Sequence, residues 1–147
     1  MTHSRDILLV EDNPDDVELT RIAFAEAGSD HRLQVVTDGA QALDYLFAQG
    51  AFAGRDPADL PAVVLLDLNL PKRNGREVLQ AIRANPATRS LPVVVLTTSA
   101  EPVDVDVVYE LGANSYIQKP VEFERFVEVV RQIGLYWLVL NQPPCRG

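Results

Sequence analysis

The alternation of short apolar runs with longer amphipathic stretches is the feature that most restricts the fold of this sequence. Five runs rich in β-branched residues occupy positions 7–10, 33–36, 63–66, 93–96 and 116–117. All but the second run, which contains Gln34, are apolar throughout, and such runs indicate strands covered on both faces, as in parallel sheets. Strand and helix patterns that alternate five times predict an α/β fold, with a doubly wound five-stranded parallel sheet and helices on both faces.

Residues that start and stop helices agree with this order. Asp12 or Asn13 can cap a first helix that begins at Pro14 and ends before Gly28. Gly75 is expected to open a later helix, which ends near the Asn-Pro pair at 85–86.

Two other stretches are less regular. In residues 99–112, valine alternates with aspartate as it would in a strand, but Pro102 and Gly112 favour a weak helix. Residues 50–61 are rich in Gly, Ala, Pro and Asp and are expected to form a long surface loop.

Size, charge and cysteine content exclude several classes of protein. A chain of 147 residues fits one domain, and its single cysteine, Cys145, cannot form an intrachain disulfide. The net charge of -8, without a basic stripe, argues against direct nucleic-acid binding. The run at 7–10 is too short for a signal peptide, and no stretch approaches the roughly 18 apolar residues of a membrane span. We therefore expect a cytoplasmic protein with protein partners and no membrane association.

Chemically capable side chains follow four of the five runs. Glu11 and Asp12 follow the first run, Asp67 the third, Thr97 the fourth and Lys119 the fifth. Ligands of open parallel sheets bind beyond the carboxyl ends of the strands, so these side chains are expected to converge. Three carboxylates brought together repel one another, and Mg²⁺ held by oxygen ligands is the usual remedy. An aspartate carboxylate can then act as a nucleophile toward phosphorus, while a lysine and a hydroxyl stabilise phosphoryl oxygens.

Each residue also has an ordinary explanation when it is taken alone. Glu11 and Asp12 could be a helix cap and its neighbour, and Asp67 could begin a turn. Thr97 could simply end a strand, and Lys119 could be a solvated surface lysine. Their arrangement at the ends of successive strands favours the functional interpretation.

Four segments together resemble the receiver domains of two-component response regulators. They read ILLVEDN, then VLLDLNLP with Gly75, then VLTTS, then GANSYIQKP, and they span residues 7–120 in order and spacing. The resemblance implies a flavodoxin-like receiver fold, with the domain at 5–140 and a C-terminal tail at 141–147. It also implies a signalling domain that catalyses only its own phosphotransfer and autodephosphorylation, in a phosphorelay with a sensor histidine kinase.

The same resemblance implies roles for individual residues. Asp67 would be the phosphoacceptor, and Mg²⁺ would lie among Glu11, Asp12, Asp67 and the backbone carbonyl of Asn69. Lys119 would pair with the phosphoryl group. Thr97 and Tyr116 would form the pair that switches with phosphorylation.

A narrower resemblance is to the single-domain regulators of phytochrome-type histidine kinases. It rests on the long loop before the third strand, the phrase LPKRNG and the ending IGLYWL. It implies red-light signalling and a homodimer, which we expect to form through helix 4 (99–112), strand 5 (116–117) and helix 5, the last predicted helix. A phosphotransfer protein or an effector is expected as a further partner.

The last predicted helix bears on that dimer. Its expected core stripe comprises Phe123, Phe126, Val127, Val130, Ile133 and Trp137. Val129, Tyr136 and Leu140 widen the apolar surface. The wider surface favours a dimer, and the alternative is a well-buried helix with a frayed end.

Two other functions agree less well with the sequence. A phosphohydrolase of the haloacid-dehalogenase type also uses an aspartate nucleophile with Mg²⁺, but that family has a second aspartate two residues later, where this chain has Asn69. A degenerate receiver that acts only as a docking module would not need Glu11, Asp12, Asp67, Thr97 and Lys119 together.

Overall fold

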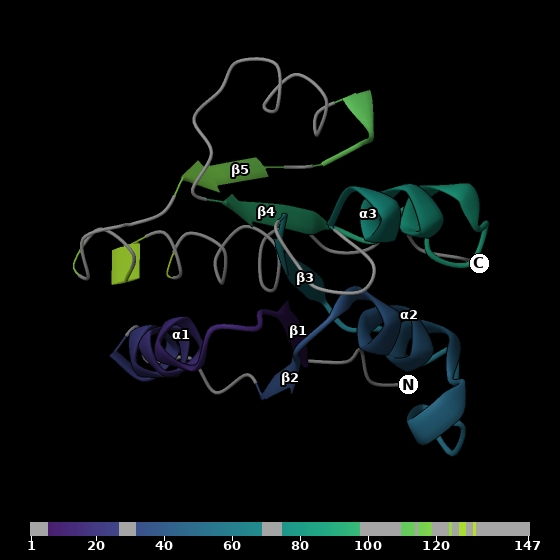
Figure 1. Ribbon diagram of the computed structural model, residues 1–147, viewed down its shortest axis with the longest axis horizontal. Helices are drawn as coiled ribbons and strands as arrows, with labels where there is room; N and C mark the ends of the chain where they lie inside the picture. The colour runs from purple at the N-terminus through teal and green to yellow at the C-terminus, as the bar shows by residue number, and fades with distance from the viewer. Residues whose placement is uncertain are drawn as a thin grey trace.

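The computed structural model describes residues 6–26, 32–68, 75–97, 110–113 and 115–118, with 124, 127, 128 and 131. The elements follow the predicted alternation (Figure 1) and are β1 (Ile7–Val10), α1 (Pro14–Glu26), β2 (Leu33–Val36), α2 (Gly39–Phe47), the 3-10 helix η1 (Gly50–Phe52), β3 (Val63–Asp67), α3 (Gly75–Ala84), β4 (Val93–Thr97) and β5 (Ser115–Gln118). Predictions that concern Gly28, Asn69 and Lys119 lie outside the described residues, as do most of those for 99–112 and for the last helix.

The five strands form one parallel sheet in the order β2-β1-β3-β4-β5. Leu9 lies opposite both Val35 of β2 and Leu65 of β3, so β1 is a central strand. The chain adds β2 on one side of β1 and then continues with β3 on the other side. This reversal creates the switch point beyond β1 and β3 at which open parallel sheets bind ligands. The predicted five-stranded parallel sheet is confirmed.

Successive residues of the central strands point to opposite faces of the sheet, as the two-residue period of a strand requires. Figure 1 shows α2 and α3 on one side of the sheet and α1 on the other. Leu8, Val10, Val64 and Leu66 join the core beneath α2 and α3. Ile7, Leu9, Val63 and Leu65 join a second core with Phe24 of α1 and Val127. Val127 is the one residue of the predicted last-helix stripe that the structure describes.

Helix α1 begins where its capping signals predicted. The Asn13 side-chain oxygen accepts hydrogen bonds from the backbone N–H groups of Asp15 (2.9 Å) and Asp16 (3.4 Å). Asn13, rather than Asp12, is therefore the N-cap, and Asp12 keeps its carboxylate free of that role. Asp15 and Asp16 also place negative charge at the positive end of the helix dipole.

The expected loop at 50–61 is not entirely loop, because it begins with η1. Phe52 of η1 packs edge-on against Tyr45 of α2, with ring centroids 5.2 Å apart. The Arg55 guanidinium lies 3.8 Å from the Tyr45 ring centroid and donates hydrogen bonds to the carbonyls of Tyr45 and Asp59. These aromatic and cation–π contacts order a segment whose composition predicted only a loop.

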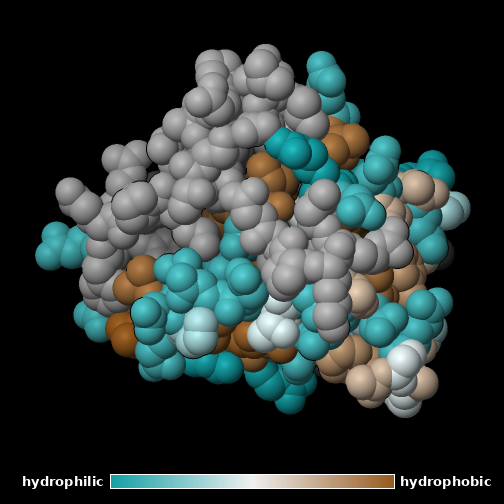
Figure 2. Space-filling model, viewed as in Figure 1, coloured by the Kyte–Doolittle hydropathy of each residue, from teal (hydrophilic) through white to brown (hydrophobic). Residues whose placement is uncertain are grey.

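The described surface is mainly hydrophilic over α1, at the lower left of Figure 2. Ile22 is the large hydrophobic residue of the described chain that is exposed. No described helix has the length and apolarity that a bilayer-crossing segment needs.

Candidate functional site

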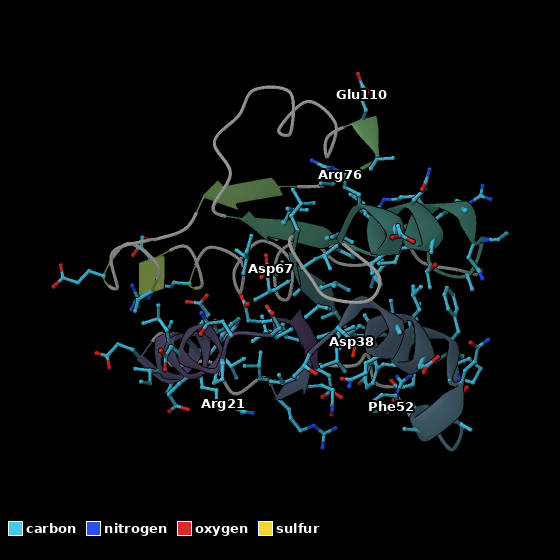
Figure 3. All side chains as sticks on the ribbon, in the orientation of Figure 1. Arg21, Asp38, Phe52, Asp67, Arg76 and Glu110 are labelled. Carbon is cyan, nitrogen blue, oxygen red and sulfur yellow. The ribbon has the colours of Figure 1, made fainter. Side chains whose placement is uncertain are left out.

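Three predicted carboxylates meet at the carboxyl edge of the sheet. Glu11 and Asp12 directly follow β1, and Asp67 is the last residue of the neighbouring strand β3. A carboxylate oxygen from each lies within 4.8 Å of the other two. Figure 3 shows Asp67 near the middle of the molecule, between α1 and β4. The three acidic side chains that were expected to converge at the strand ends therefore do so.

The three carboxylates differ in their exposure to solvent. Glu11 is 1% exposed and Asp67 is 6% exposed, whereas Asp12 lies at the surface. Glu11 and Asp67 thus form the buried part of the cluster, and Asp12 forms a side that is open to solvent. A ligand can approach from the open side, and the two buried groups have little water to solvate their charge.

Backbone contacts fix Glu11 between β2 and α1. Its N–H group donates to the Val36 carbonyl at 3.0 Å, which extends the pairing of β1 with β2 by one residue. One carboxylate oxygen of Glu11 accepts a hydrogen bond from the Asn13 N–H group at 3.3 Å. Asn13 therefore caps α1 and also orients Glu11, so a single residue ties the helix start to the site.

The backbone around Asp67 is fixed by β4 and by the start of α3. The Leu68 N–H group donates to the Leu96 carbonyl at 3.0 Å, and the Gly75 N–H group donates to the Leu68 carbonyl at 3.0 Å. A Cβ atom at position 75 would lie 2.6 Å from the Asp67 carbonyl oxygen and 2.7 Å from the Leu68 Cα atom. Only glycine permits this approach of the α3 start to the strand that carries Asp67.

The donor set suits a hard divalent cation. Three carboxylates whose oxygens lie within 4.8 Å of one another repel when all are ionised, and a cation held by oxygen atoms removes that repulsion. Asp38 is also buried, but its carboxylate caps α2 by accepting from the Gln41 N–H group at 2.8 Å. Among the described residues, the group that could hold a metal is Glu11, Asp12 and Asp67.

The other predicted site residues are described only in part. Thr97 ends β4, where its backbone lies opposite Gln118, and Tyr116 lies opposite Val95. For both residues the description covers the backbone and not the side chain. Lys119 follows β5 directly in the sequence, and like Asn69 it lies outside the described residues. The strand order nevertheless makes the carboxyl ends of β3, β4 and β5 neighbours.

Comparison with known proteins decides the family. The response regulator receiver domain family matches residues 7–131, which include all five strands of the sheet. The chain belongs to this family. The fold and the position of the acidic cluster at the strand ends agree with the membership.

Several relatives of this receiver cover nearly its whole length. It is 41% identical to the response regulator Rcp1 of a Synechocystis strain, over 90% of this chain and 88% of Rcp1. It is 44% identical to a probable methanogenesis regulatory protein, FilR2, of Methanothrix harundinacea, over 94% of this chain and 86% of FilR2.

Solved structures give the same assignment. The phosphorylated cyanobacterial phytochrome response regulator RcpA superposes with a TM-score of 0.85 at 38% identity, covering 98% of this chain and all of RcpA. The bacteriophytochrome response regulator RtBRR superposes with a TM-score of 0.79 at 52% identity, covering 96% of this chain and 84% of RtBRR. A structure of Rcp1 in its Mn²⁺-bound form superposes with a TM-score of 0.82 at 39% identity, covering 95% of this chain and 99% of that one. This chain is thus a response regulator receiver domain whose relatives include phytochrome response regulators.

Proposed function

We propose that this receiver accepts a phosphoryl group on Asp67 from the phosphohistidine of a sensor histidine kinase, with Mg²⁺ at the site. The observation that carries the proposal is the position of the Asp67 carboxylate at the end of β3, with Glu11 and Asp12 oxygens within 4.8 Å. Family membership supplies the class of donor. The surrounding carboxylates supply the means to hold a cation beside the nucleophile.

The chemistry would proceed by in-line displacement at phosphorus. An Asp67 carboxylate oxygen forms the new bond while the bond to the kinase's imidazole nitrogen breaks, so the site must position the donor and offset negative charge. Glu11, Asp12, Asp67 and the Asn69 carbonyl would hold Mg²⁺, which would neutralise carboxylate and phosphoryl charge. The Mn²⁺-bound form of Rcp1 supports a divalent cation here.

The remaining predicted residues, Lys119, Thr97 and Tyr116, would bind the phosphoryl group or respond to it. Lys119 would pair with the phosphoryl group, and the Thr97 hydroxyl would donate a hydrogen bond to it. Tyr116 would follow Thr97 and change the face formed by helix 4, strand 5 and helix 5. Water would later attack the acyl phosphate, so that the receiver dephosphorylates itself.

The upstream partner we propose is a phytochrome-type photoreceptor kinase. RcpA and RtBRR, both named as phytochrome response regulators, match nearly the whole chain. The downstream partner would be a phosphotransfer protein or an effector, reached by protein contact in the cytoplasm. The receiver domain would extend over 5–140, and 141–147 would form a tail.

Phosphotransfer from a purified phytochrome kinase tests this function directly. Labelled phosphate should reach the wild-type chain in the presence of Mg²⁺ and should not reach an Asp67→Asn variant. Asp15→Asn is the matched control, because Asp15 is an exposed acid on α1 that lies outside the carboxylate group. Normal labelling of Asp67→Asn would overturn the assignment of the phosphoacceptor, and absent labelling of the wild type would favour a docking module.

We also propose a homodimer through helix 4, strand 5 and helix 5. The extra apolar residues of the last predicted helix, Val129, Tyr136 and Leu140, support it. Sedimentation at tens of micromolar, with and without acetyl phosphate, should show a dimer in at least one state. A monomer in both states would contradict the proposal.

A further inference from the structure

Arg83, on the last turn of α3, binds backbone carbonyls from two separate segments. Its Nε and Nη2 atoms donate to the Gly112 carbonyl at 2.9 and 2.7 Å. Its Nη1 atom donates to the Leu91 carbonyl at 2.6 Å and to the Arg89 carbonyl at 3.0 Å. The rigid, planar guanidinium can reach these carbonyls together, which a lysine ammonium cannot do with the same geometry.

The two segments are those that lead into β4 and β5. Leu91 and Pro92 precede β4, and the Pro92 carbonyl accepts a hydrogen bond from the Val64 N–H group of β3 at 2.9 Å. Gly112 precedes β5 by three residues. Arg83 therefore fastens the beginning of β5 to a segment that is itself bonded to β3, the strand that ends in Asp67.

The contact with Arg83 favours glycine at position 112. Its backbone has a φ of 97°, and a Cβ atom there would lie 2.8 Å from Arg83 Nε and 3.1 Å from Arg83 Cδ. A side chain at position 112 would be strained and would also displace the guanidinium. Burial lowers the pKa of the Arg83 guanidinium, which stays charged at neutral pH.

β5 is the outer strand of the described sheet and pairs only with β4 there. The position of β5 along the strand direction is therefore set by its pairing with β4 and by the contacts that hold the residues before it. A shift of β5 along β4 would move the whole of Ser115–Gln118, and Lys119 is the next residue in the sequence.

We propose that Arg83 is a positioning residue for phosphotransfer, which holds the beginning of β5 so that Lys119 is placed at the phosphoryl group on Asp67. This inference rests on the proposed function. Arg83 lies at the opposite end of the strands from the carboxylates, so it acts through the backbone of β5. Glu11, Asp12 and Asp67 lie at the far ends of β1 and β3, so Mg²⁺ affinity is expected to change little without Arg83.

The test compares Arg83→Met and Arg83→Lys with the wild type, well below the melting temperature of each. The phosphorylation rate with acetyl phosphate, at saturating Mg²⁺, should fall between about tenfold and about a hundredfold in Arg83→Met. The Mg²⁺ dissociation constant, measured calorimetrically without a phosphodonor, should stay within about twofold of wild type. Arg83→Lys should give an intermediate rate, and it keeps the test usable if Arg83→Met does not fold. Arg89→Met is the control, because Arg89 is exposed and its backbone carbonyl, which the substitution keeps, accepts the hydrogen bond from Arg83.

Amide NMR chemical shifts distinguish a local displacement of β5 from a loosening of the whole fold. Arg83→Met should move the amides from Gly112 through β5 to Lys119 and leave those of Glu11, Asp12 and Asp67 in place. An unchanged rate, an equal loss of Mg²⁺ affinity, or shifts that end before Lys119 would each overturn the inference. If the wild type itself takes no phosphate, the proposed function fails instead.

Discussion

Gly75 lies where the start of α3 touches the backbone at the end of β3, the strand that carries Asp67. A methyl group there would meet the Asp67 carbonyl oxygen at 2.6 Å and the Leu68 backbone at 2.7 to 3.0 Å. Backbone atoms cannot rotate away as a flexible side chain can. Any larger residue must therefore move α3 or the end of β3, and either movement displaces Asp67.

Gly75→Ala should lower the free energy of unfolding by about 1 to 3 kcal/mol, as overpacking against fixed atoms does. It should also slow phosphorylation of the fraction that remains folded. Chemical denaturation and acetyl phosphate labelling measure the two effects. Gly54→Ala is the matched control, because a Cβ atom there meets nothing within 4 Å. Equal effects of the two substitutions would show that the close approach at Gly75 has no special consequence.

At the level of single residues, the sequence predicted which residue types lie at the strand ends better than it predicted the contacts between residues. Glu11, Asp12 and Asp67 were predicted because each follows an apolar run, and strand ends in a parallel sheet share one edge. Gly75 was predicted to open a helix, but nothing in the sequence indicates its approach to Asp67. Arg83 was missed, because an arginine late in a helix usually points to solvent, and the carbonyls it binds are distant in sequence.

Helix α2 ends in a conformation that costs free energy. Ala48 caps the helix with φ 54° and ψ 55°, and its N–H group bonds back to the last turn. A left-handed backbone costs an L-residue about 1 to 2 kcal/mol, and glycine adopts it without a steric penalty. The natural residue at this position is therefore not the most stable one.

Ala48→Gly should raise the free energy of unfolding by between about 0.5 and 1 kcal/mol, after the added flexibility of the unfolded chain is subtracted. Ala53→Gly should lower it, because Ala53 is exposed and has an ordinary φ of -60°. Thermal denaturation of the two variants should thus shift in opposite directions. Shifts in the same direction would show that backbone conformation does not decide the outcome.

Helices and strands were predictable where a single hydrophobic pattern dominates the local sequence. All five strands begin and end within about one residue of their predicted positions, since short runs of mainly apolar residues suit the strands of a parallel sheet. The prediction that 50–61 is entirely loop was wrong, because contacts between side chains order this segment. Phe52 and Arg55 both pack on Tyr45, and no local pattern in the loop reveals that partner.

For the whole molecule, the acidic cluster links metal binding to stability. The chain carries a net charge of -8, and two of its carboxylates are buried beside each other at the site. Folding must therefore bring like charges together at the end of β1 and β3. A cation that binds only the folded state would offset this cost by mass action.

Mg²⁺ should accordingly stabilise the wild type, by about 2.7 kcal/mol at a concentration one hundred times its dissociation constant. Asp12→Asn should lose most of this increment. Without Mg²⁺ it should be at least as stable as the wild type, because it removes one of three mutually repelling charges. Asp15→Asn should respond to Mg²⁺ as the wild type does, since it keeps the carboxylate group intact. Melting curves across a Mg²⁺ titration measure all three. A full Mg²⁺ increment in Asp12→Asn would place the cation elsewhere, and an equal loss in both variants would make the effect one of general charge screening.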